Sequence, residues 1–281
     1  MADGTRGVLT STEEVAARLG EAGLRILEVD EDTDAYGRGH LEGALAVHWK
    51  RDLQDPIRRD FIGADAFAAL MDQLGIGDGT EVVLYGGNNN WFAAYAYWYF
   101  TYYGHQPVRL MDGGRKKWEL EGRPLVTEVP RVEPGEGYRA KGPLDEIRAL
   151  RGMVEQVIGR SGFGLVDVRS PEEYRGEKLA PDHLPQEGAQ RPGHVPGAVN
   201  VPWAKAVDPD TGAFLPAERL RSLYEGQGLT PDLEVVAYCR IGERSAHTWF
   251  VLHELLGYPR VRNYDGSWTE WGSLVAAPIE R

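Results

Sequence analysis

Short hydrophobic runs alternate with amphipathic segments along the whole chain. The runs have the length and composition of buried strands; the predicted strands are residues 24–29, 82–85, 108–111, 165–168, 235–238 and 261–264. The segments around them space hydrophobic residues as helices do; the predicted helices are residues 11–18, 64–74, 91–103, 144–158, 217–226 and 245–256. Hydrophobic strands between helices are typical of a mostly parallel sheet with helices on both faces. The pattern therefore predicts an α/β fold.

The chain also contains an internal repeat. Three pairs of segments match in order: residues 39–49 with 193–203, 81–87 with 234–240, and 112–118 with 265–271. Because the offset is 153 or 154 residues each time, the repeat unit is a whole domain. Residues 124–141 are rich in Pro, Gly and charged residues, as an interdomain linker is. We therefore predict two tandem domains, residues 1–123 and 142–281, joined by this linker.

The second half carries an extra segment at about residues 177–191, between its first predicted strand and the first repeat match. The segment is full of Pro, Gln and Gly. It is interpreted as a surface excursion that borders the site or docks on the other domain. A solvent-exposed loop is the alternative.

Composition narrows the classes of protein. A hydrophobic share of 42% and a charged share of 26% are ordinary for a soluble globular protein. No hydrophobic run approaches transmembrane length, and the first residues lack the hydrophobic region of a signal peptide. The net charge of −12 argues against nucleic acid as a partner. We expect a cytoplasmic protein that binds neither nucleic acid nor membranes.

The chain has one cysteine, Cys239, directly after a predicted strand. One cysteine excludes an intramolecular disulfide and every multi-cysteine metal site, and we expect no metal and no cofactor. Most lone cysteines are inert packing residues. However, the following loop contains Gly242 and two arginines, Arg240 and Arg244, and leads into a predicted helix. A thiol facing a helix N-terminus and two guanidiniums should have a lowered pKa and act as a nucleophile, while the loop amides hold an anion. The loop predicts a thiol enzyme for a small anion.

The first half lacks this chemistry. Gly86 stands where the second half has Cys239, and the loop at residues 86–90 has neither a nucleophile nor a cation. The first domain is therefore predicted to be catalytically silent. Its sheet can still shape a cleft, because open α/β sheets bind ligands beyond the carboxyl ends of their strands.

Several motifs together identify a family. They are the tandem repeat, Asp-Val-Arg at residues 167–169, Gly-His-x-Pro-Gly-Ala at 193–198, Cys-Arg-Ile-Gly-Glu-Arg at 239–244, and Asp-Gly-Ser-Trp at 265–268. From about Val8 to Ala277 the chain resembles two-domain rhodaneses, and the cysteine loop resembles bacterial thiosulfate sulfurtransferases of the actinobacterial type. The resemblance implies two tandem rhodanese-like domains, with the catalytic loop in the second.

The resemblance also implies a double-displacement reaction. The Cys239 thiolate would attack the outer sulfur of thiosulfate, release sulfite and become a persulfide. Cyanide or a cellular thiol would then accept the sulfur. Arg240 and Arg244 can bind the sulfonate oxygens. The terminal sulfur can be surrounded by backbone amides of the loop, those of Ile241, Gly242, Glu243 and Ser245. Gly242 permits the backbone conformation that this requires.

The loop departs from the vertebrate-type pattern. A thiosulfate-binding lysine of that pattern is replaced by Ile241, and an arginine is replaced by Glu173. Arg244 at the sixth position would compensate. Mercaptopyruvate sulfurtransferases carry Cys-Gly-Ser-Gly-Val, which Arg240 and Ile241 do not match. A 3-mercaptopyruvate sulfurtransferase and a persulfide carrier without turnover remain the alternatives.

A dual-specificity phosphatase is a further alternative, because its fold and cysteine loop can resemble those of a rhodanese. Its loop needs an arginine after five intervening residues, where this chain has Ser245. Arg244 leaves four intervening residues, which argues against a phosphatase.

Two pairs of polar residues in the motifs have a structural interpretation and a functional one. Asp167 and Arg169 are expected to form a buried ion pair, with substrate contact as the alternative. His40 and His194 occupy matched positions in the two halves, which favours a hydrogen-bonded structural role. The histidine of mercaptopyruvate enzymes that corresponds to His40 lies near the cleft.

The remaining candidates surround the cysteine loop. Asp265, Ser267 and Trp268 follow the last predicted strand and should border the pocket, with Trp268 as a wall. Glu243 is unfavourable beside a dianion and is expected to point outward. His247 lies too far along the helix to be proposed as a base.

Overall fold

The computed structural model describes residues 7–181 and 188–281. Within these residues the chain forms two compact units. One unit comprises the described residues 7–144 and Val207–Phe214, and the other comprises the described parts of 145–206 (145–181 and 188–206) and Leu215–Arg281. The segment 124–141 belongs to the same compact unit as the residues before it. The division into a silent domain, a linker and a catalytic domain stays a prediction.

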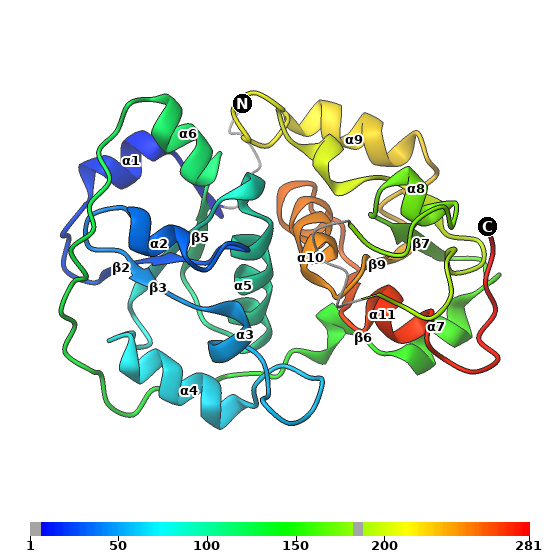
Figure 1. The fold of residues 1–281 in the computed structure, drawn as a ribbon, viewed down its shortest axis with the longest axis horizontal. Coiled ribbons are helices and arrows are strands. Elements are labelled where there is room, and N and C mark those ends of the chain that lie inside the picture. The colour runs from blue at the N-terminus through cyan, green and yellow to red at the C-terminus, as the bar shows by residue number, and fades with distance from the viewer. Residues whose placement is uncertain (1–6, 182–187) are drawn as a thin grey trace. The chain divides into compact units, whose positions relative to one another are not determined.

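The first unit contains a five-stranded parallel sheet with the order β1-β5-β4-β2-β3. The strands are β1 (Leu9–Thr10), β2 (Leu24–Glu28), β3 (Leu45–Ala46), β4 (Glu81–Tyr85) and β5 (Val108–Met111). The helices are α1 (Thr12–Ala17), α2 (Ala35–Arg38), α3 (Trp49–Asp52), α4 (Ala64–Gln73), η1 (Asn88–Asn90), α5 (Trp91–Tyr102) and α6 (Gly114–Leu120). Helices lie on both faces of this sheet (Figure 1). The unit is therefore an α/β layered fold.

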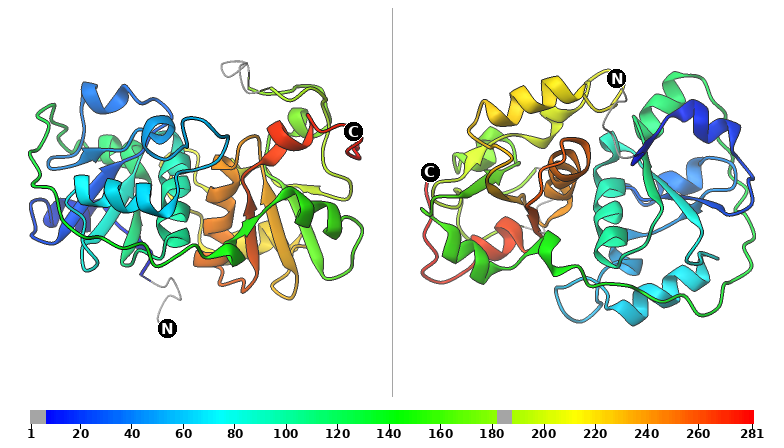
Figure 2. Two further views of the ribbon diagram at one scale, coloured as in Figure 1. Left: turned by 90° about the horizontal axis from the view of Figure 1, so that it is seen from below. Right: turned by 180° about the vertical axis from the view of Figure 1, so that it is seen from behind.

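The second unit repeats this topology. Its parallel sheet has the order β6-β10-β9-β7-β8, formed by β6 (Arg148–Ala149), β7 (Phe163–Asp167), β8 (Val199–Asn200), β9 (Glu234–Tyr238) and β10 (Val261–Tyr264). The helices are η2 (Asp145–Ile147), α7 (Arg151–Val157), α8 (Pro171–Tyr174), η4 (Trp203–Ala206), α9 (Ala217–Glu225), α10 (Glu243–Trp249), the π-helix η5 (Phe250–Leu255) and α11 (Ser267–Trp271). Figure 2 shows each sheet between its helices. The shared strand order confirms the tandem α/β fold and the duplication.

Local sequence signals explain the helix starts and the cores. The Ser11 hydroxyl accepts from the Glu14 amide at 3.0 Å, and the Glu14 carboxylate accepts from the Ser11 amide at 2.8 Å, which together form a capping box at the start of α1. Trp118 and Trp271, at matched positions, lie in the cores of the two units. Each indole N–H donates to a proline carbonyl oxygen, at 2.9 Å and 3.0 Å. Both tryptophans are core residues.

Two helices begin at other residues than predicted. The helix predicted over 144–158 begins only at Arg151, because residues 145–149 form η2 and the short strand β6. Asn263 of β10 lies opposite Arg148 in this pairing. A two-residue strand is too short to show a hydrophobic pattern. The helix predicted from residue 245 begins at Glu243 and continues into a π-helix.

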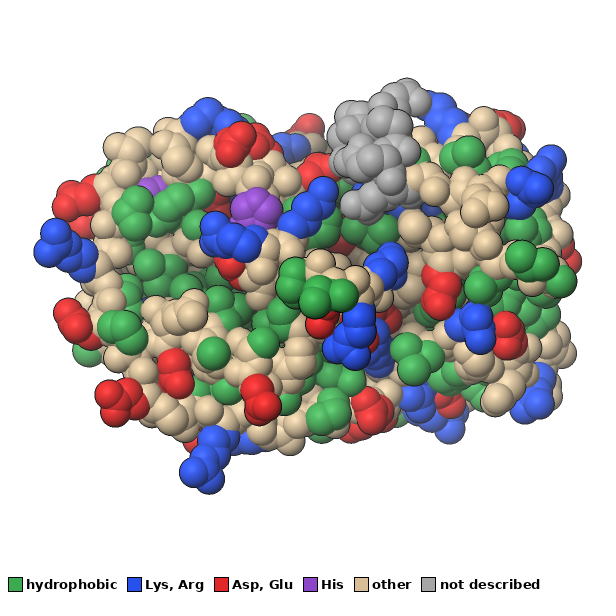
Figure 3. All heavy atoms as spheres, turned by 60° about the horizontal axis from the view of Figure 1, so that its bottom comes forward, with side chains coloured by type: hydrophobic (Ala, Val, Ile, Leu, Met, Phe, Trp, Pro, Cys, Tyr) green, Lys and Arg blue, Asp and Glu red, His purple; other side chains and the backbone are tan. Residues whose placement is uncertain are grey.

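Two further expectations concern the surface. Acidic and basic side chains are interspersed over the face shown in Figure 3. Among the described residues, no helix has the length and hydrophobicity needed to cross a membrane. No cluster of potential metal ligands occurs within the same residues.

Candidate active site

Cys239 follows β9 directly and begins a tight loop that enters α10. Its side chain is buried, with 0% exposure. The Gly242 amide, at the N-cap position of α10, donates a hydrogen bond to Sγ at 3.2 Å. A parallel strand thus places the thiol at its carboxyl end, and the loop curves back so that a backbone amide points at the sulfur. This geometry suits a negative charge that develops on sulfur.

Glycine is required at position 242. Its φ of +102° lies in the region that glycine favours. A Cβ at this position would lie 2.7 Å from the Asp265 Cα, a distance that non-bonded carbon atoms do not reach. Gly242 therefore allows both the turn and the close approach of the segment after β10.

The segment after β10 holds the backbone of the cysteine. Ser267 has a positive φ of 52°. Its hydroxyl donates to the Tyr264 carbonyl oxygen at 2.6 Å and accepts from the Cys239 amide at 3.0 Å. The Trp268 amide donates to the Cys239 carbonyl oxygen at 3.0 Å. Ser267 and Trp268 thus fix the nucleophile's main chain.

Ser245 and Asn263 connect the loop to β10. The buried Ser245 hydroxyl donates to the Asn263 Oδ1 at 2.6 Å. The Asn263 Nδ2 donates to the Gly242 carbonyl oxygen at 3.0 Å. These contacts hold both ends of the turn that presents the Gly242 amide to sulfur.

The expectation that Glu243 points outward is wrong. Its side chain is fully buried, and its Oε2 lies 3.2 Å from the Cys239 Sγ and 3.2 Å from the Ile241 amide nitrogen. Its Oε1 lies 3.4 Å from the Arg240 Nη2 and 3.7 Å from the Arg244 Nε. The two guanidiniums and the amide compensate the buried carboxylate, which explains why it can face inward.

The expectation of a lowered thiol pKa is also wrong for this resting state. Burial raises the pKa of the Cys239 thiol above its ordinary value, and the negative charge of Glu243 raises it further. Arg244 and the Ser245 backbone amide oppose this rise. The resting cysteine is therefore a thiol that donates to a carboxylate.

Arg244 is bound by an acidic residue from α8. Its Nη1 and Nη2 donate to the two Glu173 oxygens, at 2.9 Å and 3.1 Å. Burial opposes ionisation of Glu173, but the Arg244 charge outweighs it and lowers the Glu173 pKa. Two arginines, 240 and 244, thus face two glutamates, 173 and 243, around the thiol. The formal charges of these four groups cancel.

Asp167 and Arg169 form the expected buried ion pair. Both side chains are 0% exposed, and the Arg169 Nη2 lies 2.5 Å from the Asp167 Oδ2. The same nitrogen donates to the Gly193 carbonyl oxygen at 2.7 Å. The guanidinium lies over the Trp268 ring, 4.6 Å from its centroid. The pair therefore supports Trp268 and the Gly-His segment from inside the unit.

His40 and His194 have matching surroundings. The Nδ1 of each lies against the carbonyl oxygen of a tyrosine on a short preceding helix, at 2.9 Å for Tyr36 and 2.8 Å for Tyr174. Each imidazole is also stacked on that tyrosine ring with a centroid separation of 3.7 Å. The same arrangement in both units supports the structural interpretation of these histidines.

Asp265 and His247 are placed away from proton transfer at sulfur. Asp265 forms a two-pronged ion pair with Arg148 of β6, at 3.0 Å and 2.9 Å. His247 is buried in α10 with its ring edge-on to Trp203. Burial lowers the pKa of His247 to about 3, so its imidazole is neutral at pH 7.

In the corresponding loop of the first unit, a side-chain amide stands where the second unit has the Glu243 carboxylate. Asn90 occupies the position that matches Glu243, and its Oδ1 accepts from the Gly86 amide at 2.9 Å. Its Nδ2 donates to the Met111 carbonyl oxygen at 2.7 Å. In the second unit the matched amide is that of Cys239, and it donates to the Ser267 hydroxyl. The serine therefore allows residue 243 to face the sulfur.

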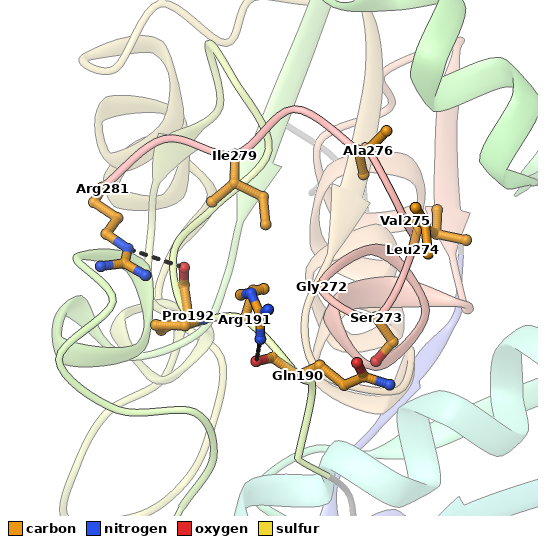
Figure 4. Close-up of a pocket in the computed structure, with 11 residues that line it drawn as sticks. Gln190, Arg191, Pro192, Gly272, Ser273, Leu274, Val275, Ala276, Ile279 and Arg281 are labelled. Atoms are coloured by element: carbon orange, nitrogen blue, oxygen red, sulfur yellow. Dashed lines mark hydrogen bonds between the residues drawn. The ribbon is translucent and has the colours of Figure 1, made fainter.

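The extra segment predicted at 177–191 lies partly outside the described residues, at 182–187. Its end lines a cavity of about 670 Å³ between Gln190–Pro192 and the C-terminal stretch (Figure 4). The Arg191 carbonyl oxygen accepts from the Trp268 indole at 3.0 Å, which ties this segment to α11. The residues that line this cavity do not include Cys239 or its loop.

Residues 11–121 and 150–274 match the rhodanese-like domain family. The chain belongs to this family. It is 60% identical to the "Putative thiosulfate sulfurtransferase" of Mycolicibacterium smegmatis over 97% of each chain. It is 57% identical to the "Sulfur carrier protein TtuD" of Thermus thermophilus, over 98% of this chain and 96% of that one. Among solved structures, EanB in complex with ergothioneine aligns with a TM-score of 0.84 at 22% identity, covering 99% of this chain and 71% of that one.

Three residues that pair with side chains or main-chain groups of the site could not be identified as partners from the sequence. Glu173 lies 71 positions before Arg244, and its only local signal is the capping box that it forms with Ser170. Asn263 lies on β10, where a polar residue inside a predicted strand was the available signal. Arg148 lies on the two-residue strand β6, which offered no such signal.

Proposed function

We propose that the protein is a sulfurtransferase that moves the sulfane sulfur of thiosulfate to cyanide or a thiol through a persulfide on Cys239. The observation that carries the proposal is the Gly242 amide aimed at the buried Sγ at 3.2 Å. A persulfide formed there extends into a loop whose main chain is fixed by Ser267 and Trp268. The names of the M. smegmatis and T. thermophilus relatives support sulfur transfer as the reaction class.

Arg240 is the proposed contact for the donor's sulfonate oxygens. Both Nη atoms of Arg244 are bound to Glu173, so Arg244 contributes charge more than free donor atoms. The thiosulfate dianion would thus meet a cluster whose own formal charge is zero, with no excess positive charge to compensate it. Binding of thiosulfate should accordingly be weak and salt-dependent.

A persulfide carrier is the second candidate, favoured by the name of the T. thermophilus relative. A carrier loads sulfur and keeps it until a specific acceptor protein takes it. An enzyme returns to the free thiol with small acceptors such as cyanide.

Initial rates with cyanide, using thiosulfate or 3-mercaptopyruvate as donor, test the proposal. Faster turnover with thiosulfate than with 3-mercaptopyruvate is expected, and none with Cys239→Ser. Preference for 3-mercaptopyruvate would contradict the assigned donor. Persulfide formation without turnover would favour the carrier.

A further inference from the structure

The buried Glu243 carboxylate is in direct contact with the reacting sulfur. Its Oε2 lies 3.2 Å from the Cys239 Sγ, and its Oε1 faces Arg240 and Arg244. The Ile241 amide donates to the same Oε2 at 3.2 Å. In this contact the Cys239 thiol is the donor and the Glu243 Oε2 is the acceptor.

Sγ therefore has two partners of opposite kind. The Gly242 amide donates to sulfur, and sulfur donates to Glu243. When the thiol proton moves to Oε2, the amide stays in place to stabilise the thiolate. The loop thus holds both the proton acceptor and the stabiliser of the product anion before any substrate arrives.

We propose that Glu243 is a catalytic residue that accepts the Cys239 proton when sulfur is loaded and returns it when sulfur is delivered. This inference rests on the proposed sulfur transfer. Its basis is the contact between the fully buried Glu243 Oε2 and the Cys239 Sγ, within hydrogen-bond distance and shielded from solvent.

In the loading step, the S–H proton moves to the Glu243 carboxylate. The Cys239 thiolate attacks the outer sulfur of thiosulfate and a new S–S bond forms. The S–S bond of thiosulfate breaks, and sulfite leaves with its electron pair. The products are a persulfide anion and a neutral Glu243.

In the delivery step, the carbon of cyanide attacks the outer sulfur of the persulfide. A C–S bond forms, and the persulfide S–S bond breaks with its electron pair moving to Sγ. Sγ takes the proton back from Glu243. Thiocyanate leaves, and the thiol and carboxylate are restored, so no external acid or base enters the cycle.

The other ionisable groups near this pair hold fixed charges around neutral pH. Arg240 and Arg244 remain cationic, and Glu173 is ionised against Arg244. On the neighbouring elements, charged groups are paired with each other: Asp265 with Arg148, and Asp167 with Arg169. His247, on the same helix as Glu243, stays neutral. The proton shared by Cys239 and Glu243 should therefore make loading independent of pH between about 6 and 8.

The test is the rate of persulfide formation with thiosulfate between pH 6 and 9, followed by stopped flow on three proteins: wild type, Glu243→Gln and Glu173→Gln. The wild-type rate should be flat from pH 6 to 8. Glu243→Gln should instead gain about tenfold in loading rate per pH unit up to its thiol pKa, because its thiol must lose its proton to water. Glu173→Gln removes a buried carboxylate that does not touch sulfur, and its profile should stay flat.

Thiolate absorbance in the absence of donor provides an independent measurement. Because the Glu243 charge raises the thiol pKa, Glu243→Gln should form thiolate at lower pH than wild type. The loading rate of the variant should follow this thiolate titration, whereas the wild-type rate should stay flat below its own thiol pKa, which a purely electrostatic effect of the charge does not produce. Glu243→Asp, which keeps a shorter carboxylate, should be slower than wild type with a flat profile. It is the test protein if the glutamine variant does not fold.

Two results separate the possible failures. A wild-type protein that loads sulfur, together with a Glu243→Gln variant of the same rate and pH profile, would overturn the role of Glu243 and leave sulfur transfer standing. A wild-type protein that forms no persulfide with either thiosulfate or 3-mercaptopyruvate would overturn the proposed function and, with it, this inference.

Discussion

Arg244 and Glu173 form a two-pronged ion pair inside the second unit, with side chains only 5% and 2% exposed. The two residues come from α10 and α8, and the nitrogen-to-oxygen distances are 2.9 Å and 3.1 Å. Glu173 stands where the resemblance to vertebrate-type rhodaneses leads one to expect an arginine. The loop arginine and the α8 glutamate are therefore a coupled pair, and each should depend on the other.

Removing Arg244 alone should destabilise the protein. Arg244→Gln leaves the Glu173 carboxylate buried without its partner, which should lower the free energy of unfolding by about 3–5 kcal/mol. Glu173→Gln with Arg244→Gln removes both charges and should cost less than the two single losses added together. Urea unfolding of the three variants and wild type measures both quantities. Additive losses would show that the pair is not energetically coupled.

The alanine variant of Gly242 should lose both stability and sulfur loading. Both Gly242 and Gly228 have positive φ, at +102° and +79°, but a Cβ would meet Asp265 at Gly242 and nothing within 4 Å at Gly228. Gly228→Ala is therefore the matched control, with a cost of about 1 kcal/mol from the backbone conformation.

Gly242→Ala adds the collision and displaces the amide that donates to sulfur. Loading should fall roughly 100-fold, as when one donor to a developing anion is lost. Thermal unfolding and persulfide formation on the two alanine variants measure these effects. Equal behaviour of the two variants would contradict the requirement for a close approach at Gly242.

His247 should make the stability of the protein fall in acid. Its pKa is lowered by burial to about 3 in the folded protein, against 6.5 for the free side chain. Below pH 6.5 His247 is protonated in the unfolded chain, whereas in the folded protein it stays neutral down to about pH 3. Stability from His247 is thus fully present above pH 6.5 and is lost as the pH falls, by about 1.4 kcal/mol per pH unit.

His247→Phe keeps a ring in the same space and removes the ionisable group. The free energy of unfolding of wild type minus that of the variant, measured by urea between pH 7 and 4, should decrease steadily with acid. A difference that does not change with pH would mean that His247 is not held neutral in the fold.

The position of the nucleophile could be predicted because its signals are local. A hydrophobic strand, a single cysteine and a glycine within three residues are adjacent in the sequence, and β9, the loop and α10 follow in that order. The direction of Glu243 could not be predicted this way. A rule based on charge alone places an acid away from a thiolate, whereas the inward direction depends on two arginines and on a backbone turn held by Asn263.

The thiol pKa was mispredicted for the same reason. The sequence shows the two arginines beside Cys239 but not the burial, nor the fact that Glu173 binds Arg244 from a distant segment. The strands β1 and β6 were missed because each pairs through only two residues, with β5 and β10. These contacts join segments that are far apart in the chain, so no local pattern reports them.

Whether Cys239 carries the transferred sulfur is tested most directly by the intact mass of the protein after incubation with thiosulfate and removal of the excess. Wild type should gain the mass of one sulfur atom, localised to the peptide that contains Cys239, and lose it again when cyanide is added with release of thiocyanate. Cys239→Ser should remain folded by circular dichroism and gain nothing. Sulfur transfer that persists in folded Cys239→Ser, or a wild-type protein that gains no sulfur, would contradict a persulfide on Cys239.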